Sequence, residues 1–554
     1  MQSDLDRRFD EELAKVTAPG GKLEISHDAQ GRAIVAKLPP TLPGLFRAFC
    51  ALNGALEAVV AGDERLTFAD LDRISEAIAH GLAARGIAAG DRVGIMMRNC
   101  PAWIVCYMAI LKAGGVATLL NGWWEALEAE HAILLADPKL IITDVPRAKR
   151  IAERCPDRSL VSLPIELPVE QVVAELLGDG ESAPLPEVGP EDDATILFTS
   201  GSTGESKGAL STHRAVTTGT YAYTCGLAVL RELLTQDGRA PVAQPRTLLT
   251  VPLFHVTGEV PVMLNSFVIG RCMVIMPKWD ATEALRLIEK EKVTYFVGVP
   301  TMSLELMNHP DRHKYDLSSL TDITAGGAPR PVSHVERLKA EFPHAQPALG
   351  YGLTETNAAG CANYWGNYAA KPSSTGRPQE PIIELAILGA DDGHLAAGEV
   401  GEIAIRTAAN IKGYWRNPAA TAAAFTGDGY FRTGDIGFLD EDEYLFIVDR
   451  KKEIIIRGGE NISTAEVEAE CYACPSVAEA AVFGTPDDRL GEVPVAVIYP
   501  KDGERLSEDG LRAFLDGKLA KFKIPARIII SAEPLPRLGT GKIDRRALKA
   551  QYAH

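Results

Sequence analysis

The segment TSGSTGESKG, residues 199–208, gathers residue types that bind phosphate oxygens. It holds three glycines, five hydroxyl side chains and one lysine within ten positions. Glycine lets backbone N–H groups approach a ligand closely, and hydroxyl and ammonium groups donate to the same point. The order differs from the common loop G-x-x-x-x-G-K-[ST], because two residues separate Gly204 from Lys207. We predict a phosphate-binding loop of another kind; the alternative is an exposed Gly/Ser linker.

A second glycine–lysine segment, LGTGKID at residues 538–544, also departs from the common pattern. Pro536 stands where that pattern has its first glycine, and Ile543 replaces the hydroxyl residue. Taken alone, Lys542 is one of 57 Lys and Arg residues, and a solvated surface charge is its simplest interpretation.

Composition narrows the class of protein. The chain has 554 residues, a hydrophobic content of 46% and a charged content of 24%, which is typical of a globular protein with more than one domain. A formal net charge of −17 argues against nucleic acid or an anionic membrane as a partner. No apolar run approaches 18 residues, so we expect no integral membrane segment. The charged start, MQSDLDRRFDEELAKV, lacks the apolar stretch of a secretory signal, and we expect a cytoplasmic protein.

The nine cysteines are scattered and odd in number, which favours a reducing compartment without a disulfide framework. Cys471 and Cys474 have C-x-x-C spacing, but no second pair or histidine cluster accompanies them. We interpret both as packing residues of a helix rather than metal ligands.

The pattern of elements predicts an α/β fold: a large N-terminal domain of α/β subdomains plus a β subdomain, and a small, mobile α+β C-terminal domain. Residues 66–86 predict an amphipathic helix, and apolar runs predict buried strands. These runs lie at 91–97, 194–198, 246–254, 272–277 and 293–300. Short turn-rich strands follow residue 368. We place the N-terminal domain at 1–449, a hinge at 450–452 and the C-terminal lid domain at 453–554.

Seven motifs occur along the chain in one order: TSGSTGESKG, GGAP, GYGLTET, TGD, DRKK, RGGEN and GTGK. In this order they resemble the acyl-adenylating superfamily, which includes acyl-CoA synthetases, adenylation domains of peptide synthetases and firefly luciferase. The resemblance covers essentially the whole chain. Ser206 stands where the family usually has proline, and Leu349 where a polar Gln or Asn often precedes GYG.

The resemblance implies a reaction in two steps. A carboxylic acid attacks the α-phosphate of ATP, pyrophosphate leaves, and the acyl group then passes from AMP to a thiol. It implies ATP, Mg²⁺ and coenzyme A as cofactors, and a small-molecule carboxylic acid as partner. A homodimer is also compatible with it. The GGEN, GGAP and PLFH forms favour a fatty- or aryl-acyl-CoA synthetase. The alternatives are an acyl-AMP ligase that loads a separate carrier protein and a catalytically silent binding homologue.

The resemblance also assigns roles to residues. The first loop binds the β- and γ-phosphates, and Thr354 holds the α-phosphate. Glu355 is the Mg²⁺ ligand, and Lys542 is the catalytic lysine. The loop residues are Thr199, Ser200, Gly201, Ser202, Thr203, Gly204 and Lys207. The nucleoside contacts are Gly327 and Ala328 at the adenine, Tyr351 stacked on it, and Asp435 and Arg450 at the ribose.

Four further assignments concern the acyl and coenzyme A sites and the hinge. His255 lies at the mouth of the acyl pocket, Gly459 lines the pantetheine tunnel, and Lys452 is the pivot between half-reactions. Apolar residues of the presumed pocket suggest an uncharged tail; they are Val256, Met263, Val299 and Met302. Glu466 and Glu468 are interpreted as plain helix-face charges.

Overall fold

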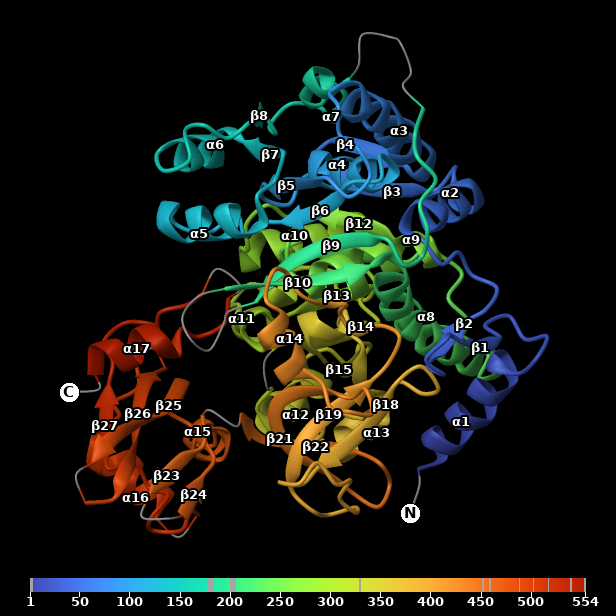
Figure 1. Ribbon diagram of the computed structural model, residues 1–554. Coiled ribbons are helices and arrows are strands. Elements are labelled where there is room, and N and C mark those ends of the chain that lie inside the picture. Colours follow the sequence, from blue (N-terminus) through green and yellow to red (C-terminus); the bar gives the residue numbers. More distant parts are fainter. Residues whose placement is uncertain are drawn as a thin grey trace.

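Two large sheets, a four-stranded sheet and a two-stranded hairpin form the N-terminal part of the molecule, and a separate sheet forms the C-terminal part (Figure 1). The computed structural model describes a set of residue ranges: 3–177, 184–199, 206–327, 330–450, 453–457, 460–487, 489–501, 503–516, 518–538 and 541–552.

The first large sheet has the strand order β20-β10-β9-β6-β5-β7-β8. Its strands are β5 (Arg92–Met96), β6 (Val116–Leu119), β7 (Leu140–Asp144), β8 (Leu160–Leu163), β9 (Asp193–Thr199), β10 (Lys207–Thr212) and β20 (Gly413–Tyr414). Strands β9, β6, β5, β7 and β8 run parallel, whereas β10 pairs antiparallel with both β9 and β20. The predicted strands at 91–97 and 194–198 are thus confirmed as β5 and β9.

The second large sheet has the order β17-β16-β15-β14-β13-β11-β12-β3-β4, parallel from β15 to β3. Its strands are β3 (Glu57–Ala61), β4 (Glu64–Thr67), β11 (Arg246–Leu249), β12 (Cys272–Ile275), β13 (Tyr295–Gly298), β14 (Asp322–Gly326), β15 (Gln346–Gly352), β16 (Gly360–Tyr364) and β17 (Arg377–Pro378). Parallel strands buried on both faces read as continuous apolar runs, which is why sequence alone located β11, β12 and β13.

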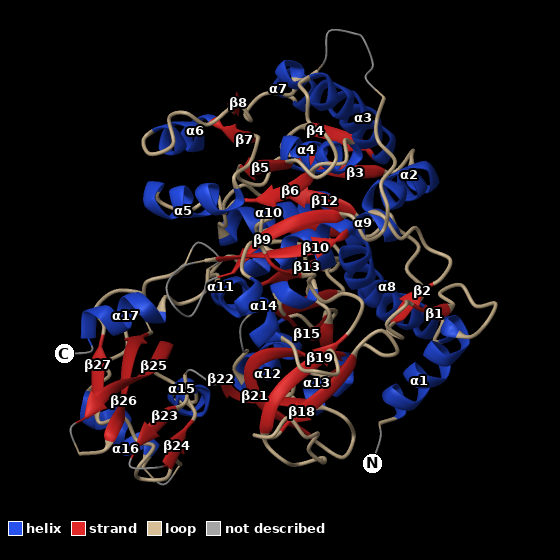
Figure 2. Ribbon diagram, viewed as in Figure 1, coloured by secondary structure: helices blue, strands red, loops and turns tan. Residues whose placement is uncertain are grey.

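Helices pack against both sheets (Figure 2). They are α2 (Leu42–Asn53), α3 (Phe68–Ala84), α4 (Pro101–Lys112), α5 (Ala126–Ala136), α6 (Val145–Ala152), α7 (Val169–Val172), α8 (His213–Gln236), α9 (Asn265–Ile269), α10 (Ala281–Glu291), α11 (Pro300–Asn308), α12 (Val332–Glu341) and α13 (Trp365–Ala370). Single turns are η1 (Ala174–Leu176), η3 (Arg312–Lys314) and η4 (Thr354–Thr356); η2 (Gly258–Leu264) is a π-helix. The predicted helix at 66–86 is confirmed as α3, which begins with a capping box of Thr67 and Asp70.

Helix α4 is apolar on every side and completely buried. One hydrophobic cluster joins it to residues of both large sheets, such as Val93 of β5 and Val297 of β13. Lys112 at its C-terminal end is buried as well, and its ammonium group contacts the carboxylates of Asp72 and Glu76 at 2.6 and 3.0 Å. A helix that is apolar all round must be enclosed, so α4 fixes the two sheets around one core.

A four-stranded antiparallel sheet, in the order β18-β19-β21-β22, forms the β subdomain. Its strands are β18 (Glu384–Leu388), β19 (Gly401–Arg406), β21 (Phe431–Leu439) and β22 (Leu445–Arg450), and α14 (Pro418–Ala424) precedes β21. Asp435 on β21 pairs directly with Arg450 on β22. This register places two predicted nucleotide contacts side by side.

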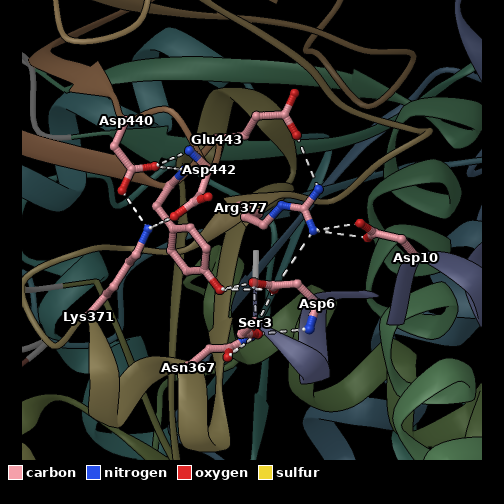
Figure 3. Close-up of polar contacts among 10 residues, drawn as sticks. Ser3, Asp6, Asp10, Asn367, Lys371, Arg377, Asp440, Asp442 and Glu443 are labelled. Carbon is pink, nitrogen blue, oxygen red and sulfur yellow. Dashed lines mark hydrogen bonds and ion pairs between the residues drawn. The ribbon is translucent and has the colours of Figure 1, made fainter. Parts of the chain in front are cut away.

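The N-terminal helix α1 (Asp4–Thr17) is fastened to the turn between β21 and β22 by polar contacts (Figure 3). Tyr444 donates its hydroxyl to the buried carboxylate of Asp6 at 3.0 Å, and the amide of Asn367 donates to the same group at 2.8 Å. Arg377 bridges Asp10, at 2.9 Å, and Glu443, at 3.1 Å. The short hairpin β1 (Ile25–His27) and β2 (Ala33–Val35) follows. Because β21 and β22 carry Asp435 and Arg450, α1 braces the strands that hold them.

The C-terminal unit is a sheet in the order β24-β23-β26-β25, with β27 paired to β26. Its strands are β23 (Ile455–Arg457), β24 (Glu460–Ile462), β25 (Val477–Asp487), β26 (Gly491–Pro500) and β27 (Arg527–Ile530). Its helices are α15 (Thr464–Tyr472), α16 (Glu508–Leu515) and α17 (Arg545–Tyr552). Cys471 and Cys474 are buried in its hydrophobic cluster, as their interpretation as packing residues requires.

The interpretation of Glu468 as a plain helix-face charge is wrong. Glu466 does lie on the surface, where Lys523 contacts it at 2.7 Å. Glu468, in contrast, is 8% exposed and accepts hydrogen bonds from the backbone N–H of Val482 and the guanidinium of Arg545. Burial raises the pKa of Glu468, and the charge of Arg545 opposes that rise. The ion pair joins α15 to the start of α17, the helix that follows Lys542.

We expect Arg545→Ala to destabilise the C-terminal unit by about 2 to 4 kcal/mol, because it leaves the Glu468 carboxylate buried without a partner; the figure is set below that of a fully buried pair since Arg545 is partly exposed. Calorimetric unfolding of the full chain measures the change. Arg546→Ala, at an exposed neighbouring position, is the control. Equal shifts from the two variants would contradict the structural role of the pair.

Candidate active site

The predicted phosphate loop connects two paired strands. Thr199 ends β9 and Lys207 begins β10, and the two residues are direct partners in the antiparallel register. Ser200, Gly201, Ser202, Thr203 and Gly204 lie outside the described residues. Directly before Lys207, the carbonyl oxygen of Ser206 lies 3.3 Å from the imidazole Nε2 of His131. The strand pair therefore presents Thr199 and Lys207 at the two ends of the loop.

Lys207 and Glu355 both contact the side chain of Tyr414. The ammonium of Lys207 lies 4.8 Å from the ring centre of Tyr414, and the hydroxyl of Tyr414 donates to Glu355 Oε1 at 2.9 Å. Burial raises the pKa of the Glu355 carboxyl, whereas the hydrogen bond from Tyr414 and the charges of Arg450 and Lys207 lower it. Three separate elements, β10, β20 and η4, thus bring together an ammonium group and a carboxylate.

Thr354 and Glu355 lie on η4, inside a tightly packed loop. A Cβ added at Gly352 would lie 2.1 Å from the carbonyl oxygen of Ala358, so only glycine fits there. Asn357 and Ala358 both adopt positive φ, at 48° and 63°. The Asn357 amide donates to Ala409 O at 2.8 Å and to Ser211 Oγ at 3.0 Å. Strained backbone held by such contacts is typical of binding sites.

Asp435 is the centre of a second cluster. It is buried, it accepts a hydrogen bond from the Tyr351 hydroxyl at 2.7 Å, and Arg450 Nε lies 3.0 Å from its other oxygen. Burial raises the pKa of Asp435, and Arg450 and Tyr351 lower it. A carboxylate offers about four acceptor positions, so two remain for a ligand. The structure brings three of the predicted nucleoside contacts together, namely Tyr351, Asp435 and Arg450.

Lys542 of the C-terminal unit lies against the N-terminal part. A Cβ added at Gly327 would approach the Lys542 Cε within 3.3 Å and its Nζ within 3.5 Å. Gly327 also has φ of 74°, which favours glycine. Burial lowers the pKa of Lys542 to about 8, Arg450 acts in the same direction and Asp435 opposes it. Ala328 lies outside the described residues.

The predicted acyl pocket begins next to Lys542. Burial lowers the pKa of His255 to about 3, and the charge of Lys542 contributes to that shift. A Cβ added at Gly541 would lie 3.2 Å from Val299 and 4.0 Å from Met302. Val256 and Met263 are buried in the main core. Val299 and Met302 thus flank the lysine loop, while Val256 and Met263 lie deeper.

Leu349, in the position before GYG, lies in a hydrophobic environment. Its side chain packs with Ala325, Val335 and Tyr368 in a small hydrophobic cluster. Two predicted residues, Lys452 and Gly459, lie outside the described residues.

Sequence reasoning missed the aromatic side chains that support the site. Tyr414 was not singled out, because nothing in KGYWRN marks it as a bridge. Trp123 packs edge-on against Phe254, with ring centres 4.9 Å apart, and Trp124 packs against Phe198 at 5.4 Å. Phe254 precedes His255 and Phe198 precedes Thr199, so the segment around NGWW borders both the acyl pocket and the phosphate loop. The adjacent tryptophans Trp123 and Trp124 are the feature of the sequence that could have pointed to this segment.

A hard divalent cation fits the Glu355 carboxylate. One oxygen is held by Tyr414, and the half-buried carboxyl forms no ion pair with any described lysine or arginine. The described residues contain no group of three or more metal ligands. Mg²⁺ commonly takes one or two carboxylates and completes its shell with phosphate oxygens and water, which matches this donor set.

Comparison with known proteins identifies the family. Residues 46–415 match the family model of AMP-binding enzymes, and residues 466–542 match the AMP-binding enzyme C-terminal domain. The chain is 35% identical to a feruloyl-CoA synthase from Amycolatopsis sp over 89% of this chain and 96% of that protein. It is 33% identical to a long-chain-fatty-acid–CoA ligase from Bacillus subtilis over 88% and 90%. The chain therefore belongs to the AMP-binding enzyme family, as an AMP-forming ligase of the acyl-CoA synthetase type.

A solved relative is known in two states. ATP-bound MatB from Rhodopseudomonas palustris superposes with a TM-score of 0.81, at 28% identity, over 93% of this chain and 99% of that chain. Apo MatB, over the same shares, gives 0.71. The arrangement of this chain is thus more similar to the ATP-bound state. Among the described residues, no helix is long and apolar enough to cross a membrane.

Proposed function

We propose that the protein activates a fatty or aryl carboxylic acid as acyl-AMP and transfers the acyl group to coenzyme A, releasing AMP and pyrophosphate. The observation that carries the proposal is the position of Lys542. This lysine comes from the C-terminal unit, yet it lies against Gly327 and within the electrostatic reach of Asp435 and Arg450. A cation held there offsets the negative charge that gathers when a carboxylate attacks the α-phosphate.

The other residues of the site each bind a different part of the nucleotide. Lys207, Thr199 and the loop between them bind the outer phosphates, Thr354 takes the α-phosphate, and Asp435 and Arg450 bind the ribose diol. Glu355 would hold Mg²⁺, which would supply charge neutralisation at the phosphates. Tyr351, held by its hydroxyl on Asp435, presents its ring to the adenine. Tyr351 and Tyr414 hold the carboxylates of Asp435 and Glu355 in place, and preorganisation of this kind lowers a barrier.

We place the working units at 1–449 and 453–554, with the hinge at 450–452. In this proposal the arrangement described is the adenylating one, which the higher similarity to ATP-bound MatB supports. Transfer to coenzyme A then needs a second arrangement, in which the loop that contains Gly459 replaces Lys542. A cytoplasmic location and a homodimer stay predictions.

The matched relatives include enzymes named for feruloyl and for long-chain fatty acids, so both aryl and fatty acids belong in the first test. Purified enzyme is mixed with ATP, Mg²⁺, coenzyme A and a panel of such acids, and AMP and thioester are measured. Thioester formation supports the proposal. Acyl-AMP that accumulates without thioester would favour loading of a separate carrier protein, and the absence of both would favour a silent homologue.

We expect Asp435→Ala to weaken ATP binding by about 1.5 to 3 kcal/mol for each charge-assisted hydrogen bond lost to the ribose. Calorimetric titration with ATP measures this change. Tyr351→Phe is the matched control, because it removes the hydroxyl that holds Asp435 and leaves the carboxylate in place. An unchanged ATP dissociation constant in Asp435→Ala would contradict the assignment of Asp435 to the ribose.

A further inference from the structure

The helix that follows His255 carries a buried carboxyl group. Glu259 lies on the π-helix η2 and is 0% exposed. Pro261, inside the same element, has no N–H to donate. Single π-helical turns are rare and are found frequently at functional sites. A charged residue type in the centre of the core therefore needs a reason.

The hydrogen bonds of Glu259 are incomplete. The hydroxyl of Tyr107 donates to Oε1 at 2.6 Å, whereas the buried Oε2 has no partner among the described residues. No described lysine or arginine forms an ion pair with it. Burial raises the pKa of Glu259 to about 7, and the bond from Tyr107 opposes that rise. Native proteins rarely leave a buried polar atom unpartnered, because each costs roughly 1 to 3 kcal/mol.

A second unpartnered group lies on the helix that carries Tyr107. Trp103 and Tyr107 are one turn apart on α4, and their rings stack with centres 5.3 Å apart. Trp103 is completely buried, and its Nε1 has no hydrogen-bond partner among the described residues. Indole N–H can only donate, and a carboxyl group can donate or accept. Each of the two groups could therefore bind an oxygen atom.

Glu259 lies one helical turn beyond His255, which is next to Lys542. The backbone N–H of Glu259 donates to the carbonyl oxygen of His255 at 3.0 Å, so Glu259 is one turn further along the same helical face. Four residues of helix rise about 6 Å. His255 is close enough to Lys542 for their charges to interact. An acid whose carboxylate lies at Lys542 would point its tail past His255 toward Glu259.

We propose that Glu259 and Trp103 form an oxygen-binding subsite at the inner end of the acyl pocket, and that the preferred acid carries a carbonyl or hydroxyl oxygen on its tail. This inference rests on the proposed function, because it specifies the tail of the acid activated there. A purely hydrocarbon tail would bury both groups without a partner. An oxygen-bearing tail satisfies the indole N–H and the free carboxyl oxygen together.

Matched acids test the subsite. Phenylpropanoic acid is compared with its para-hydroxy and para-acetyl derivatives, and decanoic acid with an oxodecanoic acid, by kcat/KM for thioester formation. We expect the wild type to prefer the oxygen-bearing members by roughly 10- to 100-fold. Glu259→Leu should abolish or reverse this preference. Glu259→Gln keeps the volume and a donor, so it should retain preference for the acetyl compound, and Tyr107→Phe should retain the preference.

A merely structural Glu259 gives a different result. In that case Glu259→Leu lowers kcat/KM for both members of each pair by the same factor, which overturns the inference, as does a wild type without preference. If no acid yields thioester, the proposed function fails, and thermal stabilisation by the same acids decides the subsite separately. Stronger stabilisation by the oxygen-bearing member, lost in Glu259→Leu, upholds it; equal stabilisation overturns it.

Discussion

Lys542→Ala lowers the rate of acyl-adenylate formation by about 100- to 1,000-fold, the range for removal of one preorganised group at a developing charge. Thioester formation from supplied acyl-AMP is largely retained, because the lysine serves the first half-reaction. Pyrophosphate release measures the first step, and thioester production from synthetic acyl-AMP measures the second. This difference between half-reactions separates a catalytic role from a general loss of structure.

The control for this variant is Lys549→Ala. Lys549 is an exposed lysine on α17, a few residues after Lys542, and its loss should leave both half-reactions unchanged. An equal loss in both half-reactions of Lys542→Ala would contradict the assignment.

The same lysine predicts a pH dependence. Its pKa is lowered to about 8, and only the ammonium form offsets negative charge, so adenylation should fall as pH rises through about 8. His255 does not account for such a limb, because its pKa lies at about 3 and it stays neutral above. The pH profile of kcat/KM for ATP reports free-enzyme groups. Lys542→Arg keeps its charge throughout, so a slower but pH-independent profile is expected.

Sequence motifs located most of this site because each motif is local. The phosphate loop follows a strand and GYGLTET ends another. The family resemblance assigned Asp435 and Arg450 to the ribose, and the structure places them on adjacent strands. The order of motifs identified the family, and the family gave Lys542 a role that its own surroundings in the sequence did not suggest.

Contacts between distant segments escaped this reasoning. Glu468 and Arg545 are 77 positions apart, and the helix TAEVEAECY has too weak an apolar periodicity to show which glutamate faces inward. Tyr414 bridges Lys207 and Glu355 from a two-residue strand, which no pattern predicts. Glu259 did carry a signal, since an acidic residue within the apolar run GEVPVML is unusual, but its partner Tyr107 becomes visible only in the fold.

The second large effect concerns the position of the C-terminal unit. Lys542 occupies the site. Strands β23 and β24, which flank the predicted coenzyme A residue Gly459 in the sequence, lie at the far end of that unit from α17 (Figure 1). The two segments belong to one sheet and its packed helices, so they cannot both reach the site in one arrangement. The unit must therefore reorient between half-reactions if the proposed transfer to coenzyme A occurs.

A covalent bridge between the two parts tests this reorientation. His334 on α12 and Tyr472 on α15 face each other across the junction, with ring centres 6.3 Å apart. Neither residue belongs to the proposed catalytic groups. All nine native cysteines are buried, so a short bis-maleimide should react selectively with the double variant His334→Cys, Tyr472→Cys. The controls are the untreated double variant and each single variant treated with the same reagent.

The bridged enzyme should still release about one equivalent of pyrophosphate with acid and ATP, and retain acyl-AMP, because the adenylating arrangement is the one that the bridge fixes. Thioester formation should fall to the level set by unbridged molecules, since a state that is no longer populated cannot contribute to turnover. A single-turnover experiment that measures acyl-AMP and acyl-CoA separately gives both values. If the bridged enzyme forms thioester as fast as the untreated double variant, one arrangement serves both half-reactions, and the lysine and coenzyme A loops do not exchange.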